Sequence, residues 1–359
     1  MPRFTTISEV FDPRHNNFGF LRFLLASLVI LSHGLPIGGF PDNDPFIILS
    51  HHATTLGSVA VAGFFALSGF LITRSYLTSN SLPQFLWHRF LRIFPGFWVC
   101  LLMTAFVIAP LMHWMEKGSM YGVFEATDSA LSYVYLNMLL FIKQWTIAGL
   151  PSTTPISGLN GSLWTLIHEF LCYLAVGIVG VLGLLRKRWT LILTVICLWM
   201  VQLVRLHAPS WVPMITGHPF IEEFIRLACT FFCGAALYVF REKIPFSGLL
   251  AVAAVLLFIL GSALGYTLEV ESVTIAYCIF WLAFRLPFQA FDKRGDFSYG
   301  LYIYAFPVQQ MLAVVDVQHY GYVPFVLLGI LGTLLFAIPS YIVVEKPMLD
   351  LKRLVVSRK

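Results

Sequence analysis

Apolar runs of about 20 residues recur along this chain from residue 18 to residue 344, and they limit what it can fold into. A helix of that length crosses the roughly 30 Å hydrocarbon core of a bilayer, because each residue adds about 1.5 Å. Of the 359 residues, 58% are hydrophobic and 11% are charged. A soluble domain carries about 25% charged residues, so this chain has too little polar surface to dissolve in water. We therefore predict an all-α, polytopic membrane protein.

Ten of the apolar runs are predicted to be transmembrane helices. They are residues 18–36, 56–74, 93–113, 162–184, 190–206, 220–240, 247–266, 271–288, 297–316 and 323–343. If both chain ends are cytoplasmic, nearly all Lys and Arg residues lie in the cytoplasmic segments, and the outer loops hold only Lys117 and Lys143, with Arg205 at a boundary. Basic residues favour the cytoplasmic side, so both termini are predicted to lie in the cytoplasm.

Residues 129–142 form an apolar segment that does not fit this pattern. At about 14 residues the segment is short for a crossing, and a full span here would move every later basic loop to the outside. We predict a short re-entrant or interfacial helix on the outer side. Residues 1–359 are predicted to form a single membrane domain without an appended soluble domain. The net charge of +5 is explained by the basic cytoplasmic loops and by their attraction to anionic lipid headgroups. No nucleic-acid partner is predicted.

Ionisable side chains inside a membrane span are costly, so each of them is a candidate for function. Arg22 and His33 lie in the first run, 11 residues apart. Eleven steps of about 100° return to the same helix face, about 16 Å further along the axis. Arg22 would lie near the cytoplasmic end and His33 in the outer third. The simpler interpretation is an interfacial arginine and a packing histidine.

Arg89 and Arg92 follow the second run at i and i+3, on one face of a helix at the cytoplasmic boundary. A guanidinium group binds phosphate oxygens through two parallel hydrogen bonds, so this pair suits a phosphorylated ligand. The alternative is ordinary anchoring at the cytoplasmic face.

Glu169 lies seven residues into a span that is entered from outside, at a depth of about 10 Å. This depth is close to that of His33, and a carboxylate can orient an imidazole for proton transfer. An acid/base pair is therefore one hypothesis, and a structural polar contact is the other. The neighbouring His168 points about 100° away and is predicted to pack in the core.

Two further groups are predicted to be structural. Glu222 and Arg226 are spaced i, i+4, which favours an ion pair on one helix. Cys229 and Cys233 share a helix face, but two ligands do not make a metal site, so no metal is predicted.

Several sequence blocks, taken in order, resemble the integral-membrane acyltransferase family 3, whose members O-acylate cell-surface sugars. The blocks are residues 22–26 (RFLLA), 31–33 (LSH), 64–73 (FFALSGFLIT), 88–95 (HRFLRIFP), 162–169 (SLWTLIHE), 298–307 (SYGLYIYAFP) and 345–347 (EKP). Each block alone is weak evidence, whereas their order over nearly the whole chain is specific.

The resemblance implies a role for each candidate residue. His33 is the expected catalytic base and Arg22 its companion, Glu169 matches the glutamate of the family, and Arg89 and Arg92 match its acyl-CoA arginines. It also implies acyl-CoA, with acetyl-CoA expected, as the co-substrate and no other cofactor. The expected acceptor is a hydroxyl of a surface polysaccharide or its lipid-linked precursor. The expected location is the bacterial inner membrane.

The chain departs from the family at Tyr304-Ala305, where many relatives have Trp-His, so the role of that histidine cannot be transferred. Two rival hypotheses remain. A proton-coupled transporter would use His33 and Glu169 as a relay, although no inverted repeat is evident. An acyl-CoA-gated sensor would bind the donor without turnover. Consumption of acyl-CoA by the purified protein distinguishes the enzyme from both rivals.

Overall fold

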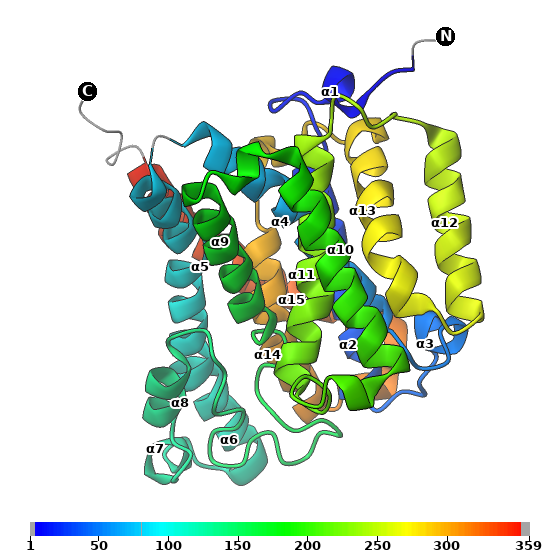
Figure 1. The fold of residues 1–359 in the computed structure, drawn as a ribbon. Helices are drawn as coiled ribbons and strands as arrows, with labels where there is room; N and C mark the ends of the chain where they lie inside the picture. The colour runs from blue at the N-terminus through cyan, green and yellow to red at the C-terminus, as the bar shows by residue number, and fades with distance from the viewer. Residues whose placement is uncertain (1–3, 80, 353–359) are drawn as a thin grey trace. The chain divides into compact units, whose positions relative to one another are not determined.

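The computed structural model describes residues 4–79 and 81–352, without the side chains of Arg186, Asp292 and Arg294 (Figure 1). In these ranges the chain forms helices and no β-strand, apart from two isolated β-bridges. Helices suit a lipid environment, because they satisfy their backbone hydrogen bonds internally. The longest are α2 (Phe18–Ile37), α4 (Leu56–Thr78), α5 (Leu82–Met103), α9 (Thr165–Val181), α10 (Arg188–His207), α11 (Pro219–Val239), α12 (Gly248–Ala263), α13 (Thr267–Arg285), α14 (Ser298–Val314) and α15 (Tyr322–Ser340).

Each of the ten predicted runs overlaps one of these helices. A π-helical turn, η1 (Thr104–Ile108), joins α5 to α6 (Ala109–Lys117). By length and composition, six helical stretches of the described chain could cross a membrane. They are Phe18–Ile37, Leu56–Thr78, Leu82–Lys117, Arg188–His207, Thr267–Arg285 and Tyr322–Asp350. The prediction of an α-helical membrane protein is therefore confirmed, whereas the count of ten spans and the cytoplasmic termini stay predictions.

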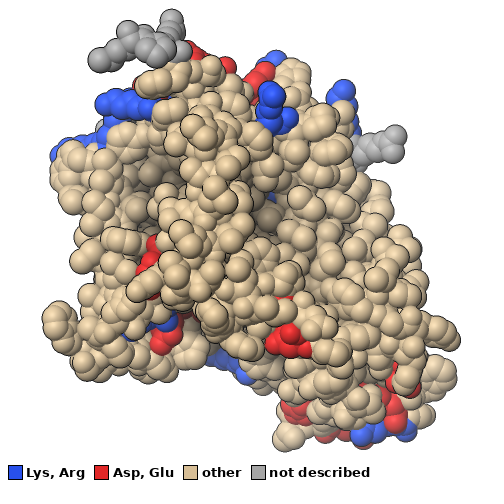
Figure 2. All heavy atoms as spheres, turned by 90° about the vertical axis from the view of Figure 1, so that its right-hand side faces the viewer, with Lys and Arg blue, Asp and Glu red and all other residues tan. Residues whose placement is uncertain are grey.

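The outward surfaces of the helices are apolar. Leu249 on α12 is 78% exposed and Leu335 on α15 is 75% exposed, as lipid-facing side chains would be. On the face drawn in Figure 2, Lys, Arg, Asp and Glu side chains cover little of the surface, and uncharged residues cover most of it. Large exposed apolar side chains on a helix are typical of a surface that contacts a membrane.

The predicted outer segment 129–142 contains a short helix, α8 (Ala130–Asn137). Its 8 residues give a length of about 12 Å, less than half of a membrane crossing. Residues 138–164 continue without an α-helix. Asn137 holds the start of this segment, because its amide donates to Gln144 O at 2.8 Å and its carbonyl accepts from Lys143 N at 2.8 Å. The short helix is thus confirmed, and its place relative to the bilayer stays a prediction.

The described helices form two compact units, each assembled from three stretches of chain. The first unit comprises Met1–Leu25, Pro45–Leu86 and His168–Arg294, and the second comprises Ala26–Asp44, Trp87–Ile167 and Gly295–Lys359. In the first unit α11 packs against α4, α10 and α13, and α12 packs against α13. In the second unit α14 packs against α15 and α6. The assignment of one domain to residues 1–359 stays a prediction.

Helices α4 and α11 of the first unit touch through their backbones. A Cβ atom added to Gly69 would lie 1.8 Å from the carbonyl oxygen of Phe231. One added to Gly234 would lie 2.1 Å from the carbonyl oxygen of Ala66. Small residues at helix contacts allow this close approach in membranes, where van der Waals packing drives association. Gly69, in the block at 64–73, therefore allows this close helix contact, a role that the apolar composition of the block does not indicate.

Gly69→Ala is expected to destabilise the protein by on the order of 1–3 kcal/mol or more, because the added methyl group must push two helix backbones apart. The measurement is thermal unfolding of the purified protein in detergent. Gly248→Ala is the matched control, since the nearest atoms to its added Cβ lie 3.6 Å away, at Trp281. Equal melting temperatures for the two variants would contradict the backbone contact.

Candidate functional site

His33 lies on α2, within the part of that helix that belongs to the second unit. Its ring packs edge-on against Phe306 of α14, with ring centroids 5.2 Å apart. Its Nδ1 atom is buried and has no hydrogen-bond partner within the described residues. A buried ring nitrogen without a partner needs an explanation, and a bound reactant is one.

Helix α14 supplies two fully buried glutamines near this point. The Nε2 atom of Gln309 donates to the carbonyl oxygen of Ile30 on α2 at 2.9 Å. The Nε2 atom of Gln310 donates to Ile156 O at 2.8 Å and to Gly158 O at 2.9 Å. Among the described residues, neither side-chain carbonyl oxygen has a donor. The glutamines fix α2 and the 156–158 loop to α14, the helix that carries Phe306.

Pro307 creates a further anchor on α14. Proline has no N–H and its ring displaces the carbonyl group four residues earlier, which is that of Ile303. That oxygen instead accepts from Asn160 Nδ2 at 2.8 Å and from the Cys100 thiol at 3.3 Å. The hydroxyl group of Tyr302 also donates a hydrogen bond to Ser162 O at 3.0 Å. Polar residues in 160–162 and the start of α14 thus form one hydrogen-bonded corner of the second unit.

Glu169 lies on α9 and belongs to the first unit. Its Oε1 atom accepts from Ser68 Oγ and from Tyr173 OH, each at 2.5 Å. The carboxylate therefore has two partners that do not involve His33, which belongs to the second unit. The pairing of these two residues stays a prediction.

His168 has the packing role predicted for it. The side chain is 1% exposed, its Nε2 atom lies 3.1 Å from Phe220 O, and its ring lies against the ring of Phe220.

Arg89 and Arg92 both lie on α5 in the second unit. The Nη2 atom of Arg92 is 2.9 Å from Asp296 Oδ2, and its guanidinium lies over the ring of Tyr299 at 5.8 Å. Tyr299 is held in turn by its hydroxyl group, which donates to Ile93 O at 2.7 Å. Arg92 is thus already engaged by an acidic and an aromatic partner, and the role of both arginines in acyl-CoA binding stays a prediction.

Arg22 lies on α2 in the first unit and lines a pocket of about 680 Å³. Arg14, Arg74 and Lys293 line the same pocket. From the sequence, these three residues were predicted only to lie in the cytoplasmic segments, and no binding role was predicted for them.

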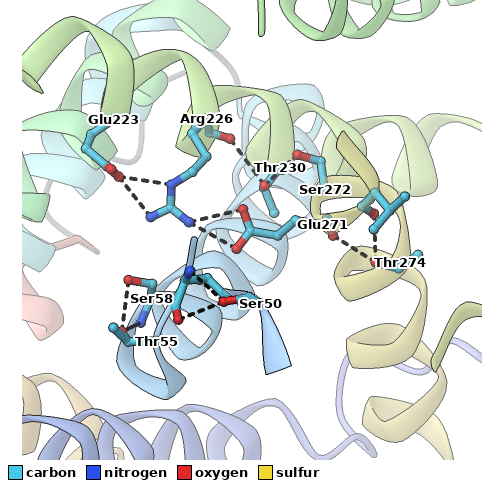
Figure 3. A network of polar contacts seen from close by, with 11 residues as sticks. Ser50, Thr55, Ser58, Glu223, Arg226, Thr230, Glu271, Ser272 and Thr274 are labelled. Atoms are coloured by element: carbon cyan, nitrogen blue, oxygen red, sulfur yellow. Dashed lines mark hydrogen bonds and ion pairs between the residues drawn. The ribbon is translucent and has the colours of Figure 1, made fainter. Parts of the chain in front are cut away.

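The predicted ion pair between Glu222 and Arg226 is wrong. Arg226 instead binds Glu271 of α13, with Nη1 at 3.0 and 3.1 Å from its two carboxylate oxygens, and it binds Glu223 at 2.9 Å (Figure 3). Glu222 pairs with Arg205 of α10 at 2.5 Å. The side chain of Arg226 is 6% exposed and that of Glu271 is 0% exposed, so the pair is desolvated. A bidentate partner on another helix therefore replaces the i, i+4 neighbour.

Sequence reasoning also missed the partners of the candidate residues. Ser68 and Asp296 stand inside or beside the sequence blocks noted above, but their roles depend on which helix each side chain meets. Polar residues inside an apolar run were the sequence signal that could have indicated such contacts. Gln309 and Gln310, for example, are adjacent within one of these runs.

Comparisons with known proteins define the class. Residues 15–342 match the acyltransferase domain family. An O-acetyl transferase from Shigella phage Sf6 is 30% identical over 94% of this chain and 96% of its own length. Nodulation protein 10 of Rhizobium leguminosarum bv. viciae is 27% identical over 96% of both chains. Acyltransferase MdmB of Streptomyces mycarofaciens is 32% identical over 43% of this chain and 36% of its own.

No solved structure is a significant match to the chain. The helical fold and these similarities define a membrane O-acyltransferase. The chain belongs to the integral-membrane acyltransferase family 3. This assignment favours the enzyme over the transporter and the sensor.

Proposed function

We propose that the protein transfers an acetyl group from cytoplasmic acetyl-CoA to a hydroxyl group of a cell-surface carbohydrate or its lipid-linked precursor, in the bacterial inner membrane. The similarity to a protein named O-acetyl transferase supports the acetyl group and the hydroxyl acceptor. Acyl-CoA is a co-substrate in this scheme, and the chemistry needs no metal.

The observation that carries the proposal is the environment of His33. Its buried Nδ1 atom has no partner among the described residues, and Phe306 braces the ring. In the proposed reaction the imidazole removes the proton of the acceptor hydroxyl group as its oxygen attacks the thioester carbonyl. The carbon–sulfur bond then breaks, and the imidazolium returns the proton to the leaving CoA thiolate. A covalent acyl-histidine is the alternative route.

The other candidates act around this step. Glu169 stabilises the imidazolium and fixes the tautomer of His33 in the proposed mechanism. Arg89, Arg92 and Arg22 bind the phosphates of the donor, because guanidinium groups form charge-assisted hydrogen bonds with phosphate oxygens.

A deletion strain is expected to lose O-acetyl groups from its surface glycan, and the wild-type gene supplied in trans is expected to restore them. The measurement is mass spectrometry and NMR of the isolated glycan, with acetyl-CoA consumption by the purified protein as the biochemical readout. Unchanged glycan acetylation in the deletion strain, with no thioester consumed by the protein, would contradict the proposal.

A further inference from the structure

The pocket that contains Arg22 is strongly cationic. It has a volume of about 680 Å³, and all of its lining residues belong to the first unit. Arg14, Arg22, Arg74 and Lys293 line it, with His15 beside them. None of the described lining residues is Asp or Glu. The volume lies in the range of about 300–1,000 Å³ that ligand pockets occupy.

The walls of the pocket are held by contacts within the protein. Asn17 donates to Ala283 O at 2.8 Å and to Leu286 O at 2.7 Å, and its side-chain carbonyl accepts from Phe288 N at 2.8 Å. The ring of Phe20 stacks on that of Phe288 at 4.2 Å. These contacts tie the start of α2 to the segment that carries Lys293, so the two walls are preformed.

Further contacts order the turn that carries Arg14 and the side chain of Arg74. Asp12 accepts from the backbone N–H of Arg14 at 2.7 Å and lies 2.8 Å from His15 Nδ1. The backbone N–H of Arg14, followed by the His15 side chain, holds the pKa of Asp12 below its ordinary value. The guanidinium of Arg74 lies over the ring of Phe11 at 5.4 Å. Asp12 lies beside this turn and is not among the residues that line the pocket.

Four cationic side chains around one pocket repel one another, and a ligand with several negative charges removes this repulsion. Guanidinium groups favour phosphate because their paired N–H groups match its oxygens. The helix that places Arg22 in the pocket also carries His33, eleven residues later.

We propose that this pocket binds the phosphate groups of the acyl-CoA donor, with Arg14, Arg74 and Lys293 as ligands beside Arg22. The inference rests on the proposed function, because that function supplies a donor with several phosphates. An anionic lipid headgroup has the same chemistry, and the experiment separates the two sources.

The test measures CoA binding by isothermal titration calorimetry with the full-length protein in phosphatidylcholine nanodiscs. Arg74→Gln and Lys293→Gln are each expected to weaken CoA binding on the order of tenfold, and the double variant is expected to weaken it further. Arg74→Lys is expected to restore part of the lost CoA affinity, because lysine keeps the positive charge but cannot form the two parallel hydrogen bonds of a guanidinium group. Pantetheine, which lacks phosphate, is expected to bind wild type and variants equally.

Arg188→Gln is the matched control, because this arginine belongs to the same unit and pairs with Glu242 at 3.0 Å outside the pocket. It is expected to bind CoA like wild type. Thermal unfolding in the same nanodiscs checks that every variant is folded, and a folded Arg74→Lys variant keeps the test valid if Arg74→Gln is not.

Two outcomes would overturn the pocket assignment alone. In the first, wild type and all folded variants bind CoA equally. In the second, the variants bind CoA like wild type but retain less phosphatidylglycerol in a parallel set of nanodiscs to which that lipid is added, which would identify a lipid headgroup site. Wild-type protein that binds no CoA would overturn the proposed donor as well, and the glycan analysis of the deletion strain reports on the function independently.

Discussion

His33→Ala is expected to abolish glycan acetylation, with a loss of on the order of 10²- to 10⁴-fold in rate, because it removes the proposed general base. The imidazole makes no hydrogen bond through Nδ1 within the described residues, so its removal breaks no polar contact at that atom. Membrane insertion and protein abundance are therefore expected to persist. The measurement is the O-acetyl content of the surface glycan at matched protein levels, together with acetyl-CoA turnover in vitro.

His319→Ala is the control for this variant. That side chain is 76% exposed and lies in the loop between α14 and α15, so its loss is expected to leave turnover unchanged. CoA affinity is expected to be the same in both variants, because the donor phosphates bind elsewhere. Substantial acetylation in the His33→Ala strain would remove the base from the mechanism.

Glu169→Gln is expected to reduce turnover by on the order of 10²- to 10⁴-fold, as when a carboxylate that orients a catalytic imidazole loses its charge. The substitution is a clean test, because the side-chain oxygen of glutamine can still accept from Ser68 and Tyr173. The fold and CoA affinity are therefore expected to be nearly unchanged. Initial rates of acetyl transfer, measured with thermal stability, separate the loss of charge from the loss of structure.

The double variant His33→Ala/Glu169→Gln extends this test. Residues that act as one catalytic unit are not additive, so the double variant is expected to be little worse than His33→Ala. Tyr173→Phe serves as the comparison, since it removes a hydrogen bond to Glu169 and leaves the charge. Full activity in Glu169→Gln would make Glu169 a structural contact, as its two hydrogen bonds within the first unit would then suggest.

The sequence by itself determined the helical architecture. The length of each apolar run sets where a helix can form, and each of the ten predicted runs overlaps a long helix. The short segment 129–142 was separated from the spans by its length and by the basic charges of the later loops, and it contains a helix of 8 residues. These predictions succeeded because they depend on local hydrophobicity and on the fixed rise of a helix.

Only the tertiary structure decided which polar side chains meet. Helical spacing predicted Glu222 as the partner of Arg226, yet a glutamate on α13 binds it with two hydrogen bonds. The carboxylate of Glu169 and the pocket around Arg22 follow the same rule, since their neighbours come from separate stretches of the chain. A sequence states which residues share a face of one helix. The face of another helix that they contact is fixed by packing, such as the backbone contact at Gly69.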